Sequence, residues 1–233
     1  GLHLMCGRTS LFAPPGRLEE RFDAESPSGL QPRYNIAPRE DLAVIRNEDP
    51  GRIRLDEWGL VPRWADDPDA TRFINARAES IEDKPSFAGP AEKRRCLVLA
   101  DGFYEWEDRR MDTRPYRVER EDGGPFAMAG LWERRTDDDG ERITVTIITT
   151  EPNEVVASLH DRMAAVLGPD EEQDWLDADD PDRRARLLST PDPEPFHAYP
   201  VSKAVNDPSA EGPDLVEHAD VPDDDPQTGL GDF

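Results

Sequence analysis

Hydrophobic and polar positions along the chain predict many short strands and a smaller number of helices. The continuous apolar run at residues 96–100 is typical of a strand that is buried on both faces. Shorter apolar or alternating runs predict further strands, and an acidic Pro-Gly turn at residues 47–51 separates two of them. These predicted strands are residues 8–12, 41–46, 52–58, 103–106, 116–119, 126–132, 143–149, 164–167 and 197–202.

Helices are expected where proline opens a segment with helical spacing. Pro14 and Pro15 precede Leu18 and Phe22, which lie one turn apart. Residues 80–95 are expected to be helical in parts, with interruptions at Pro85 and Pro90. Further helices are predicted at residues 152–159, 169–178 and 180–188, the last two with acidic first turns.

Two polar stretches interrupt this pattern. Residues 33–38, Arg-Tyr-Asn-Ile-Ala-Pro, are too polar and too closely bounded by proline for a core strand, and we interpret them as an ordered loop near a site. Residues 75–79 have a polar side chain at every second position, so an extended backbone would place Asn75, Arg77 and Glu79 on one face.

Together the elements predict one α+β domain with a mostly antiparallel β core, either barrel-like or two packed sheets, and peripheral helices. We expect residues 1–5 to be a leader or residues added in cloning, and residues 6–206 to form the single domain. Residues 207–233 contain nine acidic and no basic residues, which predicts an acidic C-terminal tail that is solvated or loosely docked.

Charge is the strongest compositional signal. The chain has 52 Asp and Glu against 28 Lys and Arg, a formal net charge of −24, yet its five Trp and eight Phe argue against a disordered acidic chain. We therefore expect haloadaptation, because concentrated salt screens self-repulsion while a hydrated acidic surface maintains solubility. Such a charge argues against general affinity for nucleic acid, so any DNA contact needs a local basic groove.

Cysteine usage and hydropathy limit the compartment and the chemistry. Two distant cysteines make no disulfide framework, four scattered histidines lack the spacing of a metal site, and no apolar run reaches membrane-spanning length. The cytoplasm is the expected location, and no metal or cofactor is expected. Cys96 lies in the apolar run and is expected to be a core residue.

Cys6 differs from Cys96 because it follows Met5, which has the position of a natural start. Loss of residues 1–5 would give Cys6 a thiol and an α-amine on adjacent carbons, both partly nucleophilic near neutral pH. Such a 1,2-aminothiol condenses with an aldehyde to an imine, which the thiol closes to a thiazolidine. The alternative is a small buried hydrophobic residue near a terminus.

Three further polar residues are candidates for chemistry. Glu105 lies between aromatic residues, either outward and solvated or held in a cleft with a raised pKa. His160 precedes an aspartate and an arginine and is either structural or catalytic. Asn75 shares a face with Arg77 and is either catalytic or engaged in local hydrogen bonds.

With Cys6, these residues lie in a series of motifs that resembles SRAP (SOS response-associated peptidase-like) proteins, which shield abasic sites in DNA. The resemblance extends in order from about Met5 to Asn206. Its motifs are MCGR at 5–8, RYNIAP at 33–38, WGLVPRW at 58–64, NARAE at 75–79, GFYEW at 102–106, AGLW at 129–132, HDRM at 160–163 and PVSKAVN at 200–206.

The resemblance implies that Cys6, as the mature N-terminus, crosslinks the ring-opened aldehyde of an abasic site in single-stranded DNA. It further implies that Asn75 holds the Cys6 amine, that Glu105 is the general acid and base, and that His160 assists opening of the sugar ring. Its implied DNA-binding residues are Arg8, Arg77 and Arg162 at phosphates, Pro38 and Trp64 at bases, and Thr149.

The chain departs from the resemblance at two places. Ala65 and Asp66 follow Trp64 where the family can have a second large residue, which predicts weaker stacking on bases. Residues 1–5, if retained, would leave Cys6 without an α-amine and limit its thiol to a reversible hemithioacetal.

Two other functions remain open. One is a thiol autopeptidase or protease that uses Cys6 with Glu105 and His160. The other is a non-catalytic single-strand DNA-binding module whose acidic tail recruits a partner. Under the leading hypothesis the protein is a lyase-like crosslinking enzyme of the DNA damage response, monomeric, with weak non-covalent capture at molar salt because phosphate contacts lose strength there.

Overall fold

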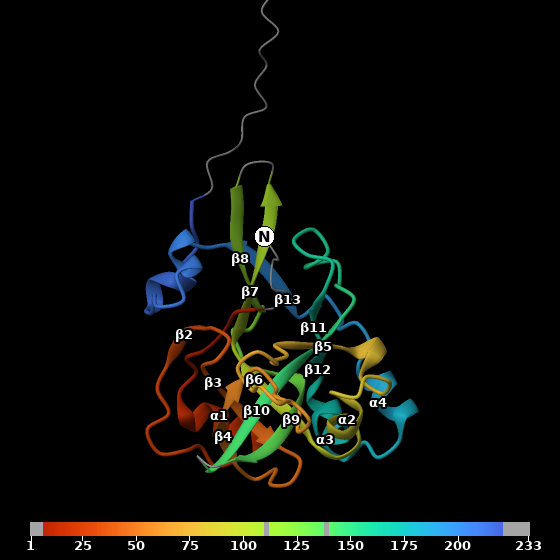
Figure 1. The fold of residues 1–233 in the computed structure, drawn as a ribbon. Coiled ribbons are helices and arrows are strands. Elements are labelled where there is room, and N and C mark those ends of the chain that lie inside the picture. Colours follow the sequence, from red (N-terminus) through yellow and green to blue (C-terminus); the bar gives the residue numbers. More distant parts are fainter. Residues whose placement is uncertain (1–6, 110–111, 138–139, 221–233) are drawn as a thin grey trace, which may run out of the picture.

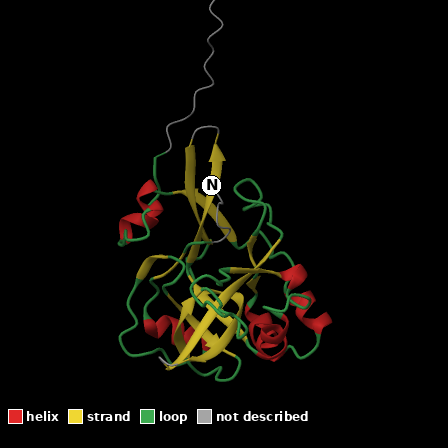
Figure 2. Cartoon of the chain, in the orientation of Figure 1, coloured by secondary structure: helices red, strands yellow, loops and turns green. Residues whose placement is uncertain are grey.

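The computed structural model describes residues 7–109, 112–137 and 140–220. They form two β-sheets with short helices at the margins, as Figure 1 and Figure 2 show. The expected α+β class with a mostly antiparallel core is confirmed. No helix in these ranges has the length and apolar composition needed to cross a bilayer.

The first sheet has five antiparallel strands in the order β13-β8-β7-β1-β2. Strands β7 and β8 form a long hairpin that projects from the body of the molecule (Figure 1). The strands are β1 (Thr9–Leu11), β2 (Arg33–Ile36), β7 (Gly102–Arg109), β8 (Asp112–Arg120) and β13 (Phe196–Pro200).

The second sheet has eight strands, and five of them close into a barrel. The order β10-β4-β3-β6-β9 returns to its start because β9 also pairs with β10. Only the pairings of β10 with β4 and β5 are parallel among these strands. The strands are β3 (Asp41–Arg46), β4 (Ile53–Trp58), β5 (Asn75–Arg77), β6 (Arg95–Ala100), β9 (Phe126–Asp137), β10 (Gly140–Thr150), β11 (Met163–Ala164) and β12 (Val166–Leu167).

The barrel strands carry the apolar runs of the sequence. Trp58, Val98 and Val145 are fully buried, as is Cys96, whose core role is thereby confirmed. A side chain at Gly130 of β9 would overlap Cys96 and Val98, so glycine is required for this close packing. Burial raises the pKa of the Cys96 thiol well above its usual value and keeps it protonated.

The helices cover the edges of the two sheets (Figure 2). Each of α1, α3 and α4 begins with proline at its first position, where the missing N–H costs nothing. The helices are α1 (Pro15–Phe22), α2 (Ala88–Lys93), α3 (Pro169–Asp177) and α4 (Pro181–Leu187), with 3-10 turns η1 (Ala78–Ser80), η2 (Lys203–Asn206) and η3 (Pro213–Val216).

Asp101 joins the two sheets, since β6 runs through it into β7. Its buried carboxylate accepts hydrogen bonds from the Ser10 hydroxyl at 2.7 Å and from the Ala13 amide at 3.0 Å. Arg117 of β8 is fully buried beside it and donates to the Asp101 carbonyl at 2.9 Å and to the Ser10 hydroxyl at 2.6 Å. Gly102 leaves the space for this guanidinium, because a Cβ there would overlap it.

Three predicted elements were wrong. Residues 33–38 are not a loop, because Arg33–Ile36 form β2 at the edge of the first sheet. Residues 152–159 form turns, not a helix, because the Asn153 side chain accepts the amides of Val155 and Val156 at 3.1 and 3.2 Å. Pro90 does not interrupt a helix but lies in the first turn of α2, where no hydrogen bond is lost.

The first part of the predicted acidic tail is firmly docked. Leu215 is buried, and the Ala219 amide donates to the Pro200 carbonyl at 2.9 Å. Tyr199 stacks on His218 with ring centroids 4.2 Å apart. The remainder of the tail, residues 221–233, lies outside the described residues.

Candidate functional site

The predicted nucleophile, Cys6, lies outside the described residues, and the description begins at Gly7. Gly7 is buried, and the Arg8 carbonyl accepts a hydrogen bond from the Tyr104 amide at 3.0 Å. Strand β1 continues this pairing, with Thr9 opposite Phe103 of β7. Arg8, two positions after Cys6, is thus hydrogen-bonded to Tyr104, the residue directly before Glu105.

Glu105 lies in the middle of β7, opposite Tyr116 of β8. It is only 1 % exposed, so the outward, solvated alternative for this carboxyl group was wrong. Because side chains alternate along a strand, Glu105 lies on the opposite face from Tyr104 and Trp106. Tyr104 is itself fixed, since its hydroxyl donates to the Tyr34 carbonyl at 2.6 Å.

Five other predicted residues gather around the end of β10. Strand β5 pairs with β10 in parallel, with Asn75 opposite Ile147 and Arg77 opposite Thr149. Strand β11, which follows the loop that carries His160 and Arg162, pairs with the same end of β10. The fold therefore brings Asn75, Arg77, Thr149, His160 and Arg162 to one edge.

Asn75 and Arg77 differ in their surroundings. The Asn75 Nδ2 atom is buried and has no hydrogen-bond partner among the described residues, which marks it as a donor that awaits an acceptor. Arg77 is exposed on the same strand. Glu79 follows in η1, so the expected shared face of Asn75, Arg77 and Glu79 ends after Arg77.

Arg162 is held by Glu79 in a two-point ion pair. Its Nη1 and Nη2 atoms lie 2.6 and 2.9 Å from the two carboxylate oxygens of Glu79, and Nη2 also donates to the Thr149 carbonyl at 2.6 Å. The Arg162 side chain is 10 % exposed, so contact with a DNA phosphate requires this pair to open. The guanidinium hydrogen bond lowers the pKa of the Glu79 carboxyl group.

The His160 ring is oriented by its own loop. Its Nδ1 atom accepts a hydrogen bond from the Arg162 amide at 3.0 Å and lies equally close, at 3.0 Å, to the Asp161 carboxylate. Nδ1 cannot both accept from the amide and donate to Asp161. The backbone bond decides the tautomer, because the Asp161 side chain is 85 % exposed and well solvated. The proton of neutral His160 is therefore on Nε2, the nitrogen that could donate to a sugar oxygen.

Pro38 and Trp64 lie on two neighbouring loops that follow β2 and β4. Arg39, in the left-handed region at φ 75°, links the loops through a hydrogen bond from Nη2 to the Asp69 carbonyl at 3.1 Å. Trp64 is 56 % exposed, which is unusual for so large an apolar side chain and fits a stacking surface.

Glu133 and Arg135 of β9, which were not predicted as site residues, hold the Trp64 loop in place. The buried Glu133 carboxylate accepts from Arg63 Nε at 2.8 Å, and Arg135 Nη1 donates to the Ala65 carbonyl at 2.6 Å. These contacts hold the backbone on both sides of Trp64. The only sequence signal was the run of charged residues at the end of an apolar strand.

Arg8 has a different environment from the phosphate-binding role that the resemblance implies. Its Nη1 atom donates to Asn35 Oδ1 at 2.7 Å and to the Val205 carbonyl at 2.6 Å, and burial lowers the pKa of its guanidinium. Asn35 and Val205 lie in two of the family-like motifs, but neither residue type carries a chemical signal alone.

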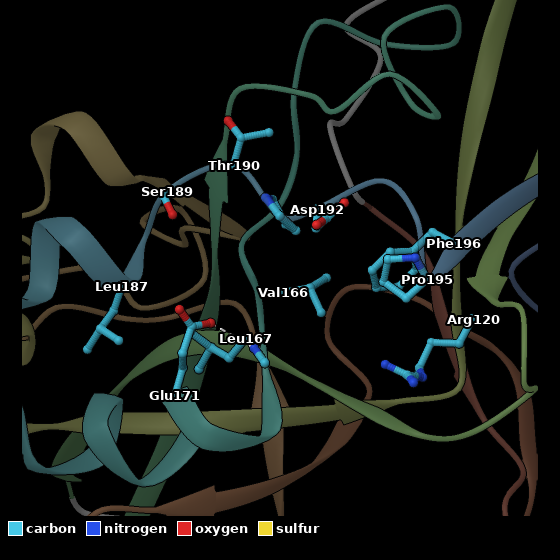
Figure 3. Close-up of a pocket in the computed structure, with 12 residues that line it drawn as sticks. Arg120, Val166, Leu167, Glu171, Leu187, Ser189, Thr190, Asp192, Pro195 and Phe196 are labelled. Atoms are coloured by element: carbon cyan, nitrogen blue, oxygen red, sulfur yellow. Dashed lines mark hydrogen bonds between the residues drawn. The ribbon is translucent and has the colours of Figure 1, made fainter.

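A separate cavity of about 230 Å³ lies between α3, α4 and β13 and contains none of the predicted site residues (Figure 3). Its wall combines Val166, Leu167, Leu187 and Phe196 with Arg120, whose guanidinium is paired with Asp122 at 3.0 and 2.9 Å. Within the described ranges, no cluster of His, Cys, Asp and Glu side chains has the arrangement of a metal site.

Comparison with known proteins relates the chain to one family over most of its length. The family model described as SOS response associated peptidase (SRAP) matches residues 5–208. The chain is 39 % identical to the abasic site processing protein YoqW of Bacillus subtilis, over 91 % of this chain and 99 % of the relative. It is 34 % identical to the abasic site processing protein HMCES of Gallus gallus, over 87 % of this chain and 74 % of the relative.

A solved structure supports the same relationship. A crystal structure of a protein from Bacteroides thetaiotaomicron superposes with a TM-score of 0.83 at 29 % sequence identity, and the match covers 92 % of this chain and all of that one. The order of motifs, the family model and the shared fold agree: the chain belongs to the SRAP family.

Proposed function

We propose that this protein recognises abasic sites in single-stranded DNA and bonds to them covalently through Cys6 as its first residue. The observation that carries the proposal is the hydrogen bond between the Arg8 carbonyl and the Tyr104 amide at 3.0 Å. It anchors the chain next to Cys6 beside the buried Glu105. The names of the relatives, which are abasic site processing proteins, support the same substrate.

The proposed reaction joins both nucleophiles of Cys6 to C1′ of the opened deoxyribose. The α-amine attacks the aldehyde carbon, and the resulting carbinolamine loses its oxygen as water to give an imine. The thiol then adds to the imine carbon, so that C1′ ends with one bond to nitrogen and one to sulfur. Both hydrogens of the released water come from the amine, and the thiol proton ends on the ring nitrogen.

The described residues suit the proton transfers of this reaction. Glu105 is withdrawn from bulk water, where a carboxyl group can exchange a proton with the amine and the departing oxygen. Asn75 Nδ2 is a buried donor without a partner in the described part of the chain, and it is suited to hold the carbonyl or amine of Cys6. His160 Nε2–H is suited to donate a hydrogen bond to the sugar oxygen as the ring opens.

Binding of the strand is assigned to residues on the surface of the molecule. Arg77 would neutralise a phosphate, and Trp64 with Pro38 would stack on or separate bases. Thr149 and Arg162 would join the phosphate contacts once Glu79 releases the guanidinium. A DNA substrate of this kind also supports the cytoplasm as the compartment.

The test uses protein that begins at Cys6 and an oligonucleotide with one abasic site. A denaturing gel should show a shifted band, and its mass should equal protein plus DNA less one water. Cys6→Ala should abolish the band. Protein with one residue retained before Cys6 should form no lasting bond, because its α-amine is then an amide. A lasting crosslink from that blocked protein would overturn the thiazolidine.

The family description as a peptidase favours thiol autopeptidase activity as the second candidate. In that case Cys6 attacks the bond before it, with Glu105 or His160 assisting, and the protein removes its own leader. Purified chain that retains residues 1–5 should then shorten on incubation, and Cys6→Ala should prevent it. A chain that stays intact without an added aminopeptidase excludes this activity.

A further inference from the structure

Asn35 connects Arg8, the residue before β1, to the C-terminal segment, residues 202–210. It lies on β2 and is fully buried. Its Oδ1 atom accepts from Arg8 Nη1 at 2.7 Å, while its Nδ2 atom donates to the carbonyls of Asp207 and Ala210 at 2.9 and 3.0 Å. The Asn35 carboxamide therefore links Arg8, near the start of the domain, to residues 207–210 at its end.

The same segment holds Arg8 and its neighbour Trp106 directly. The Val205 carbonyl accepts from Arg8 Nη1 at 2.6 Å, and Asn206 Oδ1 accepts from Trp106 Nε1 at 2.7 Å. The Arg8 guanidinium lies 5.9 Å from the centre of the Trp106 ring, within the range of a cation–π contact. Arg8 is thus fixed by its carbonyl on β7 and by its side chain on the C-terminal segment.

The segment itself is anchored well enough to serve as a support. Val205 is fully buried in a cluster with Tyr104, Tyr199 and Val201. Glu211 continues the anchoring, because its carboxylate accepts from Arg33 Nε at 2.7 Å and from the Tyr34 amide at 2.9 Å. An acidic segment that only kept the protein soluble would not need these contacts.

We propose that Asn35 and the C-terminal segment 202–210 are a positioning device for the N-terminal nucleophile, an inference that rests on the proposed function. Arg8 is two residues from Cys6, and two residues of chain span at most about 7 Å, so the freedom of the nucleophile is limited by how firmly Arg8 is held. A displacement of about 1 Å between reacting groups can slow a reaction a hundredfold. Asn35 therefore acts on the rate of crosslinking and not on DNA affinity.

Asn35→Asp separates the acceptor function of the carboxamide oxygen from the donor function of its nitrogen. The aspartate has the same size and still accepts from Arg8, but it cannot donate to the carbonyls of Asp207 and Ala210 and places a negative charge against them. Asn47→Asp is the matched control. Asn47 likewise accepts from Trp132 Nε1 and donates to the Lys93 carbonyl, each at 3.1 Å, but in the turn that follows β3.

Two measurements distinguish positioning from binding. The crosslinking rate is measured at saturating abasic oligonucleotide, and the affinity is measured with a tetrahydrofuran analogue, which has no aldehyde. For Asn35→Asp we expect a rate about ten- to a hundredfold lower, an unchanged affinity, and faster hydrogen exchange of the amides at 203–210. Asn47→Asp should match the wild type in both rate and affinity.

Arg8→Lys provides a second, independent variant. Lysine keeps the positive charge but cannot reach Asn35, the Val205 carbonyl and the Trp106 ring at once. A positioning role predicts a slower rate at unchanged affinity for the tetrahydrofuran analogue. A phosphate-binding role predicts that Arg8→Lys retains most of the rate.

The inference is overturned if Asn35→Asp crosslinks at the wild-type rate, whether or not the segment is released. Loss of affinity in proportion to rate would also overturn it, since that result would make Asn35 and Arg8 part of the DNA-binding surface. Wild-type protein that forms no crosslink would refute the proposed function instead, and the positioning role with it.

Discussion

The guanidinium of Arg162 pairs with both carboxylate oxygens of Glu79, with nitrogen-to-oxygen distances of 2.6 and 2.9 Å. The two residues are 83 positions apart and join η1 to the loop before β11. A two-point pair of this kind fixes both side chains in orientation as well as in distance. It also keeps Arg162 neutralised until an anion competes for it.

Replacement of Glu79 should make stability less dependent on acid pH. Arg162 lowers the pKa of Glu79, so the folded state holds this proton less tightly than the unfolded state. The pair therefore contributes stability above the usual glutamate pKa of about 4.3, and this contribution is lost as pH falls through the lower, folded value. Glu79→Gln should be less stable than wild type at pH 7 and equal to it in strong acid.

Urea unfolding at a series of pH values measures this difference. The Glu79 side chain is 54 % exposed, so solvent screening keeps the effect small. Glu154→Gln, which changes an acidic residue in the turns between β10 and β11, is the control for net charge. A difference between Glu79→Gln and wild type that persists unchanged into strong acid would contradict the ion-pair account.

Gly102→Ala should destabilise the first sheet. The added methyl group would overlap the fully buried Arg117 guanidinium, which must then leave Ser10 and Asp101. We expect a loss of about 2 to 4 kcal/mol in the free energy of unfolding, since overpacking and a disturbed buried charge combine. Gly51→Ala is the control, because a Cβ there meets open space. Equal stability of the two variants would show that Arg117 relocates without cost.

The sequence predicted those strands whose hydrophobic pattern is enough by itself to require burial. Residues 96–100 became β6 because an apolar run has no alternative to burial, and the helices with proline at the first position began as expected. Residues 33–38 failed because the polar side chain of Asn35 has its partners outside the segment. Asp207 and Ala210, whose carbonyls accept from it, lie more than 170 positions away.

The candidate site shows the same division. Asn75, Glu105 and His160 were predicted because an ordered series of motifs resembled a known family. Glu79 and Asn35 were missed as functional supports, because each gains its importance from an arginine that is distant in sequence. A carboxylate or an amide has no local signature for such a partner, so only the fold reveals it.

The net charge of −24 predicts that salt stabilises this protein. Screening shortens the Debye length from about 10 Å at 0.1 M to 3 Å at 1 M salt, which weakens repulsion among surface carboxylates. The thermal midpoint should rise over this range, and NaCl and KCl should act alike at equal ionic strength. A midpoint that stays level or falls would contradict the haloadaptation inferred from composition.

Arg77→Gln should weaken capture of single-stranded DNA without regard to sequence. Arg77 is exposed on β5, and a phosphate contact carries no sequence information. With the tetrahydrofuran analogue, the slope of log affinity against log salt should become shallower by about 0.7, the value for one phosphate on a single strand. Arg52→Gln, on the exposed turn between β3 and β4, should leave the slope unchanged. An altered base preference in Arg77→Gln would contradict the assignment.

Trp64→Ala should reduce affinity for the analogue oligonucleotide by about 1 to 3 kcal/mol, the usual value of one base stacked on an aromatic ring. Leu55→Ala is the matched control, since Leu55 is the other large apolar side chain exposed in the described residues, at 46 %. Arg135→Gln tests whether the loop must be held, because it removes the bond to the Ala65 carbonyl while Trp64 remains.

For Arg135→Gln we expect an intermediate loss of affinity, since a stacking ring on a loosened loop must be ordered again when DNA binds. Trp64→Ala and Arg135→Gln should not be additive in a double mutant, because both act through the same ring. Full additivity would mean that Arg135 contributes to binding by another route, and an unchanged affinity in Trp64→Ala would remove the exposed tryptophan from the DNA surface.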